Sequence, residues 1–217
     1  MENTGERPVL EHFLLVPHGI RMYSERVGCS SLDAYDATSF VFKDLIKWIF
    51  VDYKIKTFTF IGLTLNAMQV RSEEELTPII EIECTVYEDP EFIAFLKAHE
   101  VKVIFKGNFS KLPKYYKRAM KNLEKLTEGF SRHELIIMIG YGLGKRSLFH
   151  SIKKRLFKDI FAVKPPDFMV STAGRGFDAL FESIPEGTKT LVVDKYFPDL
   201  TKGDIGNYIN TNFYLRS

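Results

Sequence analysis

The chain has 217 residues, a length that suits one large globular domain over residues 1–217. Hydrophobic residues make up 45% and charged residues 27%, ordinary values for a folded protein that exclude extensive disorder. The 30 basic residues nearly balance the 28 acidic ones, so the net charge of +2 gives no support to a nucleic-acid binder.

Cysteine usage and hydropathy indicate the compartment. Cys29 and Cys84 are too few for a disulfide framework and fit a reducing environment. The N-terminus has no apolar stretch of signal-peptide length, and no apolar run approaches the ~18–20 residues of a membrane span. We therefore expect a cytoplasmic protein, with peripheral contact to a membrane as an open alternative.

Short apolar runs alternate with longer amphipathic stretches in the first half of the chain. The predicted elements are, in chain order, a strand at His12–Val16, a helix at Asp33–Tyr53, a strand at Lys56–Leu63 and a helix from Ser72 to Asp89. Ser72 and Glu75 have the spacing of a capping box, and Asp89-Pro90 is expected to end that helix.

The second half continues the same alternation. Its predicted elements are a strand at Val101–Phe105, a helix at Pro113–Glu128, a strand at Leu135–Ile139, a helix at Lys145–Ile160, strands at Phe168–Ser171 and Thr190–Val193, and a helix at Thr201–Phe213. Such regular alternation predicts an α/β fold, a single domain with a mainly parallel central sheet surrounded by helices. Ligands of such sheets bind outside the carboxyl ends of the strands, so the loops after Val16, Leu63, Phe105, Ile139 and Ser171 are candidate site loops.

Charge is segregated in the middle of the chain. Residues 73–100 hold nine acids and one base, whereas residues 102–125 hold eight bases and one acid. We interpret these runs as solvated helix faces, with attraction to anionic lipid, a diphosphate or an acidic partner as the alternative. Tyr115 and Tyr116 are interpreted as surface residues of the basic helix.

Five segments, in order and at matching spacing, carry a family resemblance. They are Pro17–Tyr23, Gly107–Pro113, Gly140–Gly142, Pro166–Gly174 and Tyr196–Ile205. Together they resemble the cis-prenyltransferases, the undecaprenyl-diphosphate-synthase family. The resemblance implies a parallel sheet with surrounding helices and one long apolar tunnel. It also implies a dimer that adds isoprene units from isopentenyl diphosphate to an allylic diphosphate, with magnesium.

The first segment departs from the family pattern. His18 stands where the family has the aspartate that helps to hold magnesium and the allylic diphosphate. Magnesium prefers carboxylate oxygen, and neutral imidazole is a poor substitute, so His18 is interpreted as a polar residue at a strand end without a ligand role. Only Gly19 and Arg21 remain as remnants of the diphosphate-binding cradle.

The other family site segments are also altered. Ser171 stands where the family has the arginine that grips isopentenyl diphosphate, and Arg175 stands where it has a glutamate near magnesium. A short hydroxyl lacks the charge and the fork geometry of a guanidinium. Gly174 and Arg175 are a candidate anion-binding site, with a flexible turn as the preferred interpretation. The stretch 63–71 lacks the polar catalytic-loop residues of the family.

The departures lead to the main functional hypothesis. They imply a non-catalytic accessory subunit of a heteromeric cis-prenyltransferase, with no catalytic residue, metal ligand or bound cofactor of its own. Magnesium is expected in the catalytic partner, a homologue of this chain, and a homodimer is the alternative assembly. The resemblance places the dimer contact on C-terminal residues, namely Tyr196, Phe197, Pro198, Phe213 and Arg216.

Two alternatives remain open at this point. One is a divergent prenyl-diphosphate transferase or synthase that is active on its own and holds magnesium through other aspartates, namely Asp167, Asp178, Asp194 or Asp199. The other is an isoprenoid-lipid binding module that keeps the tunnel without the chemistry.

Overall fold

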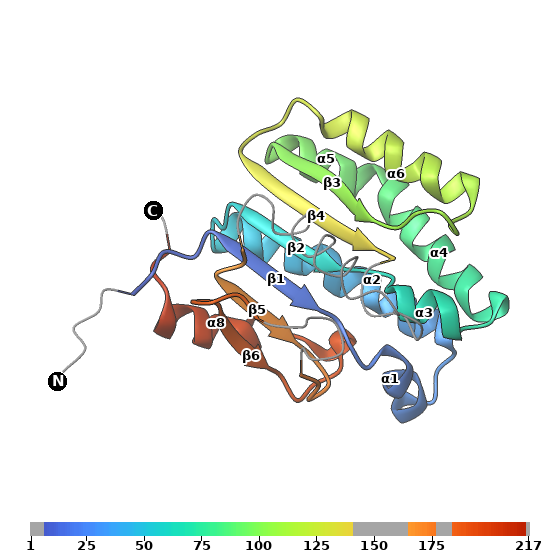
Figure 1. The fold of residues 1–217 in the computed structure, drawn as a ribbon, viewed down its shortest axis with the longest axis horizontal. Coiled ribbons are helices and arrows are strands. Elements are labelled where there is room, and N and C mark those ends of the chain that lie inside the picture. The colour runs from blue at the N-terminus through green and yellow to red at the C-terminus, as the bar shows by residue number, and fades with distance from the viewer. Residues whose placement is uncertain (1–6, 141–164, 177–183, 216–217) are drawn as a thin grey trace.

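A six-stranded parallel sheet forms the centre of the molecule, in the strand order β3-β4-β2-β1-β5-β6 (Figure 1). The computed structural model describes residues 7–140, 165–176 and 184–215. The strands are β1 (His12–Val16), β2 (Thr57–Ile61), β3 (Val101–Gly107), β4 (His133–Ile139), β5 (Phe168–Ser171) and β6 (Lys189–Val192). The predicted strands and the parallel sheet are therefore confirmed. The predicted helix at 145–160 lies outside the described residues.

The helices between the strands include three that the sequence pattern did not predict. The described helices are α1 (Ile20–Val27), α2 (Ser31–Lys47) with a π-helical turn at Trp48–Asp52, α3 (Leu65–Val70), α4 (Glu73–Glu88), α5 (Pro90–Ala98), α6 (Lys114–Thr127) and α8 (Lys202–Asn212). The helices α1, α3 and α5 are short, with at most two fully buried residues each, so they leave little apolar periodicity in the sequence.

Helix starts follow local capping rules. The predicted capping box at α4 is confirmed: the Glu75 amide donates to Ser72 Oγ, and the Glu75 carboxylate accepts from the Ser72 amide. The same reciprocal pair, Ser30 and Asp33, opens α2. These caps set the first residues of α2 and α4, and both helices begin on the side of the sheet where the carboxyl ends of the strands lie.

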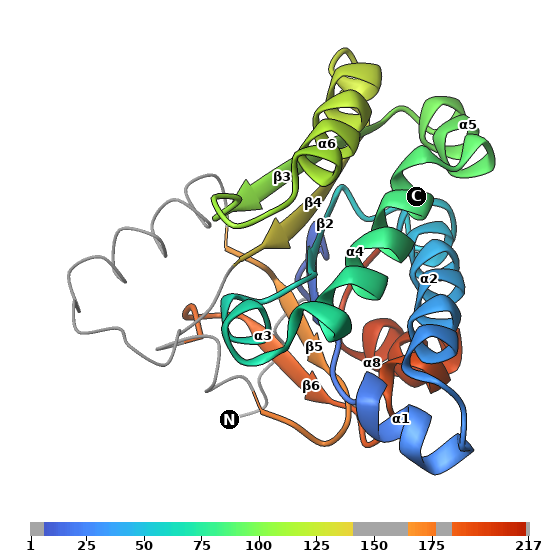
Figure 2. The same cartoon turned by 90° about the vertical axis from the view of Figure 1, so that its right-hand side faces the viewer.

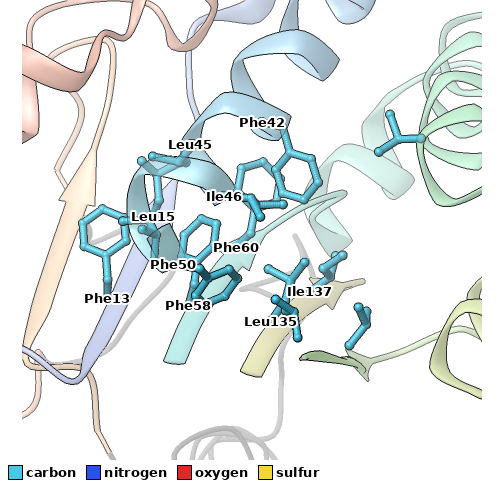
Figure 3. Close-up of a cluster of buried hydrophobic side chains, with 14 of the residues drawn as sticks. Phe13, Leu15, Phe42, Leu45, Ile46, Phe50, Phe58, Phe60, Leu135 and Ile137 are labelled. Carbon is cyan, nitrogen blue, oxygen red and sulfur yellow. The ribbon is translucent and has the colours of Figure 1, made fainter. Parts of the chain in front are cut away.

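The main core fills the space between one sheet face and the helices α2, α4, α6 and α8 (Figure 2). Phe13 and Phe58 of neighbouring strands pack with ring centroids 5.5 Å apart, and Phe42 of α2 lies 4.6 Å from Phe60 of β2 (Figure 3). Alternate residues such as Leu14 and Val16 belong to a second buried cluster. Central strands buried in this way read as continuous apolar runs, as the sequence of β1 does.

Two aromatic predictions need correction. Tyr116 is fully buried between α6 and α4, not on the surface, whereas its neighbour Tyr115 is 42% exposed. Phe40 recurs with Leu45, Trp48 and Ile49 near helical spacing in the sequence, which is typical of a core face, but it is 61% exposed, and Phe42 packs in the core instead. Both segments are helical, as predicted. Spacing alone does not decide which aromatic residue of such a helix faces the core.

Candidate functional site

A cavity of about 770 Å³ opens beside the carboxyl ends of β1 and β2. Its walls come from α1, α2, α3 and α4, of which α1 and α3 lie beyond the carboxyl ends of the strands (Figure 1). The loop after β1, the loop after β2 and Arg175 after β5 all contribute, so three of the five predicted site loops meet here. The volume is in the range of about 300–1,000 Å³ that is usual for small-molecule sites.

Gly19 shapes the mouth of the cavity. Its φ of +85° is in the left-handed region, and a Cβ at this position would lie 2.5 Å from Cδ1 of Tyr196. Only glycine therefore fits between β1 and α1 while Tyr196 packs against it. The predicted remnant Gly19 and the predicted interface residue Tyr196 are thus neighbours within one chain.

His18 lies directly before Gly19 and lines the cavity. Its backbone amide donates to Thr172 Oγ1 over 2.7 Å, and the Thr172 hydroxyl donates back to the His18 carbonyl. Burial, and secondarily the positive charge of Arg175, lower the pKa of His18 from 6.5 to about 4. The imidazole is therefore neutral at physiological pH and brings no charge to the mouth.

Three arginines line the cavity. Arg21 lies 3.8 Å from Glu75 in an exposed ion pair, Arg71 donates a hydrogen bond to the Tyr35 hydroxyl, and Arg175 Nη2 lies 3.8 Å from Met22 Sδ. Arg21 and Arg175 were predicted from the sequence, but Arg71 was not. It lies just before α4, in the stretch 63–71 that lacks the polar catalytic-loop residues of the family, so no local motif marks it. Guanidinium groups around one opening favour an anionic group such as a diphosphate.

The turn that carries Arg175 does not offer a backbone nest for an anion. The Gly174 amide donates to the Val193 carbonyl over 3.0 Å, and the Arg175 amide donates to the Thr172 carbonyl over 3.3 Å. Gly174 does not line the cavity. An anion at this side would therefore be held by the Arg175 side chain and not by the amides.

The interior of the cavity is mainly apolar. Aliphatic and aromatic side chains from α2, from β2 and the loop after it, and from α4 line it, namely Phe42, Phe60, Leu63, Ile79, Ile82 and Val86. An apolar wall behind a cationic mouth suits an amphiphile whose hydrocarbon part is removed from water.

One carboxyl group interrupts this apolar wall. Glu83 of α4 lines the cavity, and its Oε2 accepts hydrogen bonds from the Tyr116 hydroxyl and, over 3.4 Å, from the Tyr87 hydroxyl. Burial raises the pKa of Glu83 from its ordinary 4.5 to about 7. Sequence analysis did not single out Glu83, although the spacing Ile79–Glu83–Tyr87 places an acid on the buried stripe of the helix.

The aspartates of the alternative hypothesis do not meet at the cavity. Asp167 accepts from the Glu11 and His12 amides at the opposite end of β1, and Asp199 pairs with Arg26 over 2.6 Å. Neither they nor Asp194 lines the cavity, and Asp178 lies outside the described residues. Among the described residues no three His, Cys, Asp or Glu side chains gather as metal ligands. The neutral His18 and the Arg175 cation at the mouth do not fit magnesium.

The predicted interface residues divide into two groups. Phe197 is fully buried and Phe213 is 3% exposed, both within the core of this chain. Tyr196 and Pro198 are half-buried at the surface, and Arg216 lies outside the described residues. Of the described interface residues, only Tyr196 and Pro198 are accessible to another chain here. The interface itself stays a prediction. Ser171 is fully buried in β5 and does not line the cavity.

A family model of undecaprenyl diphosphate synthases matches residues 16–214. The chain belongs to this family. The match covers every segment that carried the resemblance, from Pro17 to Ile205. The predicted cis-prenyltransferase family and fold are therefore confirmed.

Several relatives are named as synthases of the family. The chain is 28% identical over 162 residues to a tritrans,polycis-undecaprenyl-diphosphate synthase of Pyrobaculum aerophilum, covering 72% of this chain and 65% of the relative. It is 26% identical to an isoprenyl transferase of Chlamydia pneumoniae, covering 64% and 63%. The matched parts thus span less than two thirds of these relatives.

A solved structure shows the same fold. Lavandulyl diphosphate synthase from Lavandula x intermedia, in complex with dimethylallyl diphosphate, matches with a TM-score of 0.79 over 96% of this chain and 98% of that one. The sequence identity is 17%, so this likeness concerns the fold alone. No helix among the described residues is long and apolar enough to cross a membrane.

Proposed function

We propose that this chain is the non-catalytic accessory subunit of a heteromeric cis-prenyltransferase, which makes a polyprenyl diphosphate from isopentenyl and allylic diphosphates. The cavity binds a prenyl diphosphate, with the arginines at the diphosphate and the apolar wall around the chain. The observation that carries the proposal is His18 at the cavity mouth, where the family pattern has a carboxylate.

The chemistry of the mouth supports binding without turnover. Ionising an allylic diphosphate requires stabilisation of the negative charge that develops on the leaving group, which magnesium supplies in the family. Here a neutral imidazole and the Arg175 cation flank the position. Arginines alone bind a diphosphate but give no anchor for the metal. The catalytic homologue would hold the magnesium.

Assembly is the second part of the proposal. The turn at Tyr196–Asp199 packs on Gly19 and, through the 2.6 Å ion pair of Asp199 with Arg26, on α1. A partner chain that contacts Tyr196 and Pro198 would therefore touch a segment packed against the cavity mouth. Such a contact offers a route by which one subunit stabilises the other; a homodimer is the alternative outcome.

Peripheral contact with a membrane is a separate proposal. The eight basic residues between 102 and 125 form no ion pair with any residue of the described parts of the chain. Lys114, Arg118 and Lys121 are exposed on α6 next to Tyr115. Such a face attracts anionic lipid. Flotation with phosphatidylglycerol vesicles, but not with phosphatidylcholine vesicles, is expected at low salt.

Co-expression with an intact homologue tests the accessory role. We expect the pair to co-purify, and prenyl transfer by the homologue to rise when this chain is present. A Tyr196→Ala variant is expected to weaken both effects. If the homologue has the same activity and the same oligomeric state with and without this chain, the accessory role is wrong.

The strongest competing function is a prenyl transferase active on its own, favoured by the intact cavity with its three arginines. An assay of the purified chain with isopentenyl diphosphate, geranylgeranyl diphosphate and magnesium discriminates between this enzyme and the accessory subunit. Elongation that disappears in Arg21→Gln would establish the enzyme. Binding of an isoprenoid with neither turnover nor a partner would instead support the lipid-binding module.

A further inference from the structure

The carboxyl group of Glu83 is held in a fixed orientation inside the cavity. Both tyrosine hydroxyls, Tyr116 and Tyr87, donate to the same oxygen, Oε2. Tyr116 is fully buried and Tyr87 is 4% exposed, so neither ring has room to move away. The two hydroxyl oxygens lie 3.4 Å apart, so the two tyrosines and Glu83 form one compact polar cluster between α4 and α6.

The second oxygen of Glu83 remains open. Within the described parts of the chain, Oε1 accepts no hydrogen bond, while the residue lines the cavity. Oε1 is not among the fully buried atoms that lack a partner, so this oxygen is open to the cavity. An unpaired acceptor that faces a cavity is therefore a feature that a bound molecule can satisfy.

The position of Glu83 separates it from the start of α4. The carboxyl belongs to the tenth position after Glu73, and a helix rises about 1.5 Å per residue, so the two backbones are about 15 Å apart. The side chains between them on the cavity side, Ile79 and Ile82, are apolar. Arg21 pairs with Glu75 in the first turn of α4, so a ligand that lies along this helix from Arg21 to Glu83 meets apolar side chains of α4 between its two polar ends.

We propose that the α4 wall of the cavity is a recognition site for a hydroxyl group on an otherwise apolar ligand, with Glu83 Oε1 as the hydrogen-bond acceptor. The inference rests on the proposed function only in placing the phosphate end of the ligand at the arginines. It goes beyond that function because a plain hydrocarbon chain gives Glu83 no partner.

A hydroxyl fits better than an ammonium group. The pKa of Glu83 is raised to about 7 by burial, so both of its protonation states are populated at neutral pH. A hydroxyl donates to the carboxylate and accepts from the carboxylic acid, whereas an ammonium group pairs with the carboxylate alone. An ammonium group would also lose its hydration on entering an apolar cavity.

The test compares pairs of alkyl phosphates that differ only at the end of the chain. n-Alkyl phosphates of eight, ten and twelve carbons and their ω-hydroxy counterparts are titrated calorimetrically into the full chain. The wild type is expected to bind the ω-hydroxy member about fivefold to tenfold more tightly at one chain length at least, the gain of one hydrogen bond. Glu83→Leu is expected to remove or reverse this preference.

A matched control comes from the same helix. Glu81 is exposed and does not line the cavity, so Glu81→Leu is expected to retain the preference. Circular dichroism of each variant reports folding, and the wild-type comparison decides the matter even if Glu83→Leu does not fold.

Each outcome separates the inference from the proposed function. Equal affinity of the two members at all three lengths, or a preference that survives in Glu83→Leu, overturns the inference and leaves prenyl-diphosphate binding intact. If the wild type binds no alkyl phosphate at all, both the proposed binding and the inference are wrong.

Discussion

The Tyr116 hydroxyl of α6 donates a hydrogen bond to the Glu83 carboxylate of α4 and lies 3.4 Å from the Tyr87 hydroxyl of the same helix. The basic helix α6 and the cavity wall of α4 thus meet at one buried polar cluster. Four predictions follow from this contact, from the arginines and from the sheet edge.

Tyr116→Phe should destabilise the fold. The phenylalanine keeps the packing but leaves Glu83 with the single long bond from Tyr87, at a cost of about 1–3 kcal/mol. Urea denaturation measures the free energy of unfolding. Tyr115→Phe is the matched control: the neighbouring side chain is 42% exposed, and we expect a change below about 0.5 kcal/mol. Equal effects of the two variants would contradict the assignment.

Stability should fall with rising pH because of Glu83. Its pKa is raised by burial from 4.5 to about 7, so the folded chain retains a proton that the unfolded chain releases between these pH values. Bound protons are then more numerous in the folded state, and the free energy of unfolding declines as pH rises through this window. The groups around the carboxyl, Tyr35, Tyr87 and Tyr116, titrate at higher pH because burial raises their pKa.

The measurement is the pH profile of urea denaturation for the wild type and Glu83→Gln, which has no carboxyl to titrate. The difference between them should grow in favour of the variant from pH 4.5 to pH 7. Taking this difference removes contributions of other groups, among them the buried His133. A parallel pair of profiles would rule out titration of Glu83 in this range.

Arg71→Gln should weaken binding of geranyl diphosphate about tenfold, because a charged hydrogen bond to phosphate contributes about 1.5–3 kcal/mol. Calorimetric titration at two salt concentrations measures it, and the salt dependence should also decrease. Arg132→Gln, at an exposed position outside the cavity, keeps the net charge matched and should leave the affinity unchanged. The same loss in both variants would indicate general charge attraction instead of a site.

Gly107→Ala should disrupt the end of β3. A Cβ on this residue would lie 1.8 Å from the Ile139 carbonyl oxygen of β4, and the φ of +129° disfavours a side chain. We expect a loss of about 3 kcal/mol or more, seen as a lower melting temperature or an insoluble product. Gly129→Ala meets no atom within 4 Å and should be tolerated. A soluble Gly107→Ala protein with an unchanged melting temperature would refute the close approach.

The long elements were predictable because their burial leaves a periodic trace. The helix at Ser31–Lys47 with its π-helical turn, and the helix at Glu73–Glu88, follow from apolar spacing and capping residues. The short helix α1 was not predicted: only Ser24 is fully buried, and its start depends on the positive φ of Gly19. A conformation set by packing against Tyr196, 177 residues later in the sequence, leaves no local signal.

The family, the parallel α/β sheet and the exchange of a carboxylate for His18 could be predicted from the amino-acid sequence, because ordered motifs and apolar runs are local properties of the chain. That Arg71 joins Arg21 and Arg175, and that Glu83 interrupts an apolar wall, emerges only from the folded chain. The same is true of the core positions of Phe197 and Phe213. These facts depend on which distant segments pack together, and packing is set by the whole fold and not by neighbours in sequence.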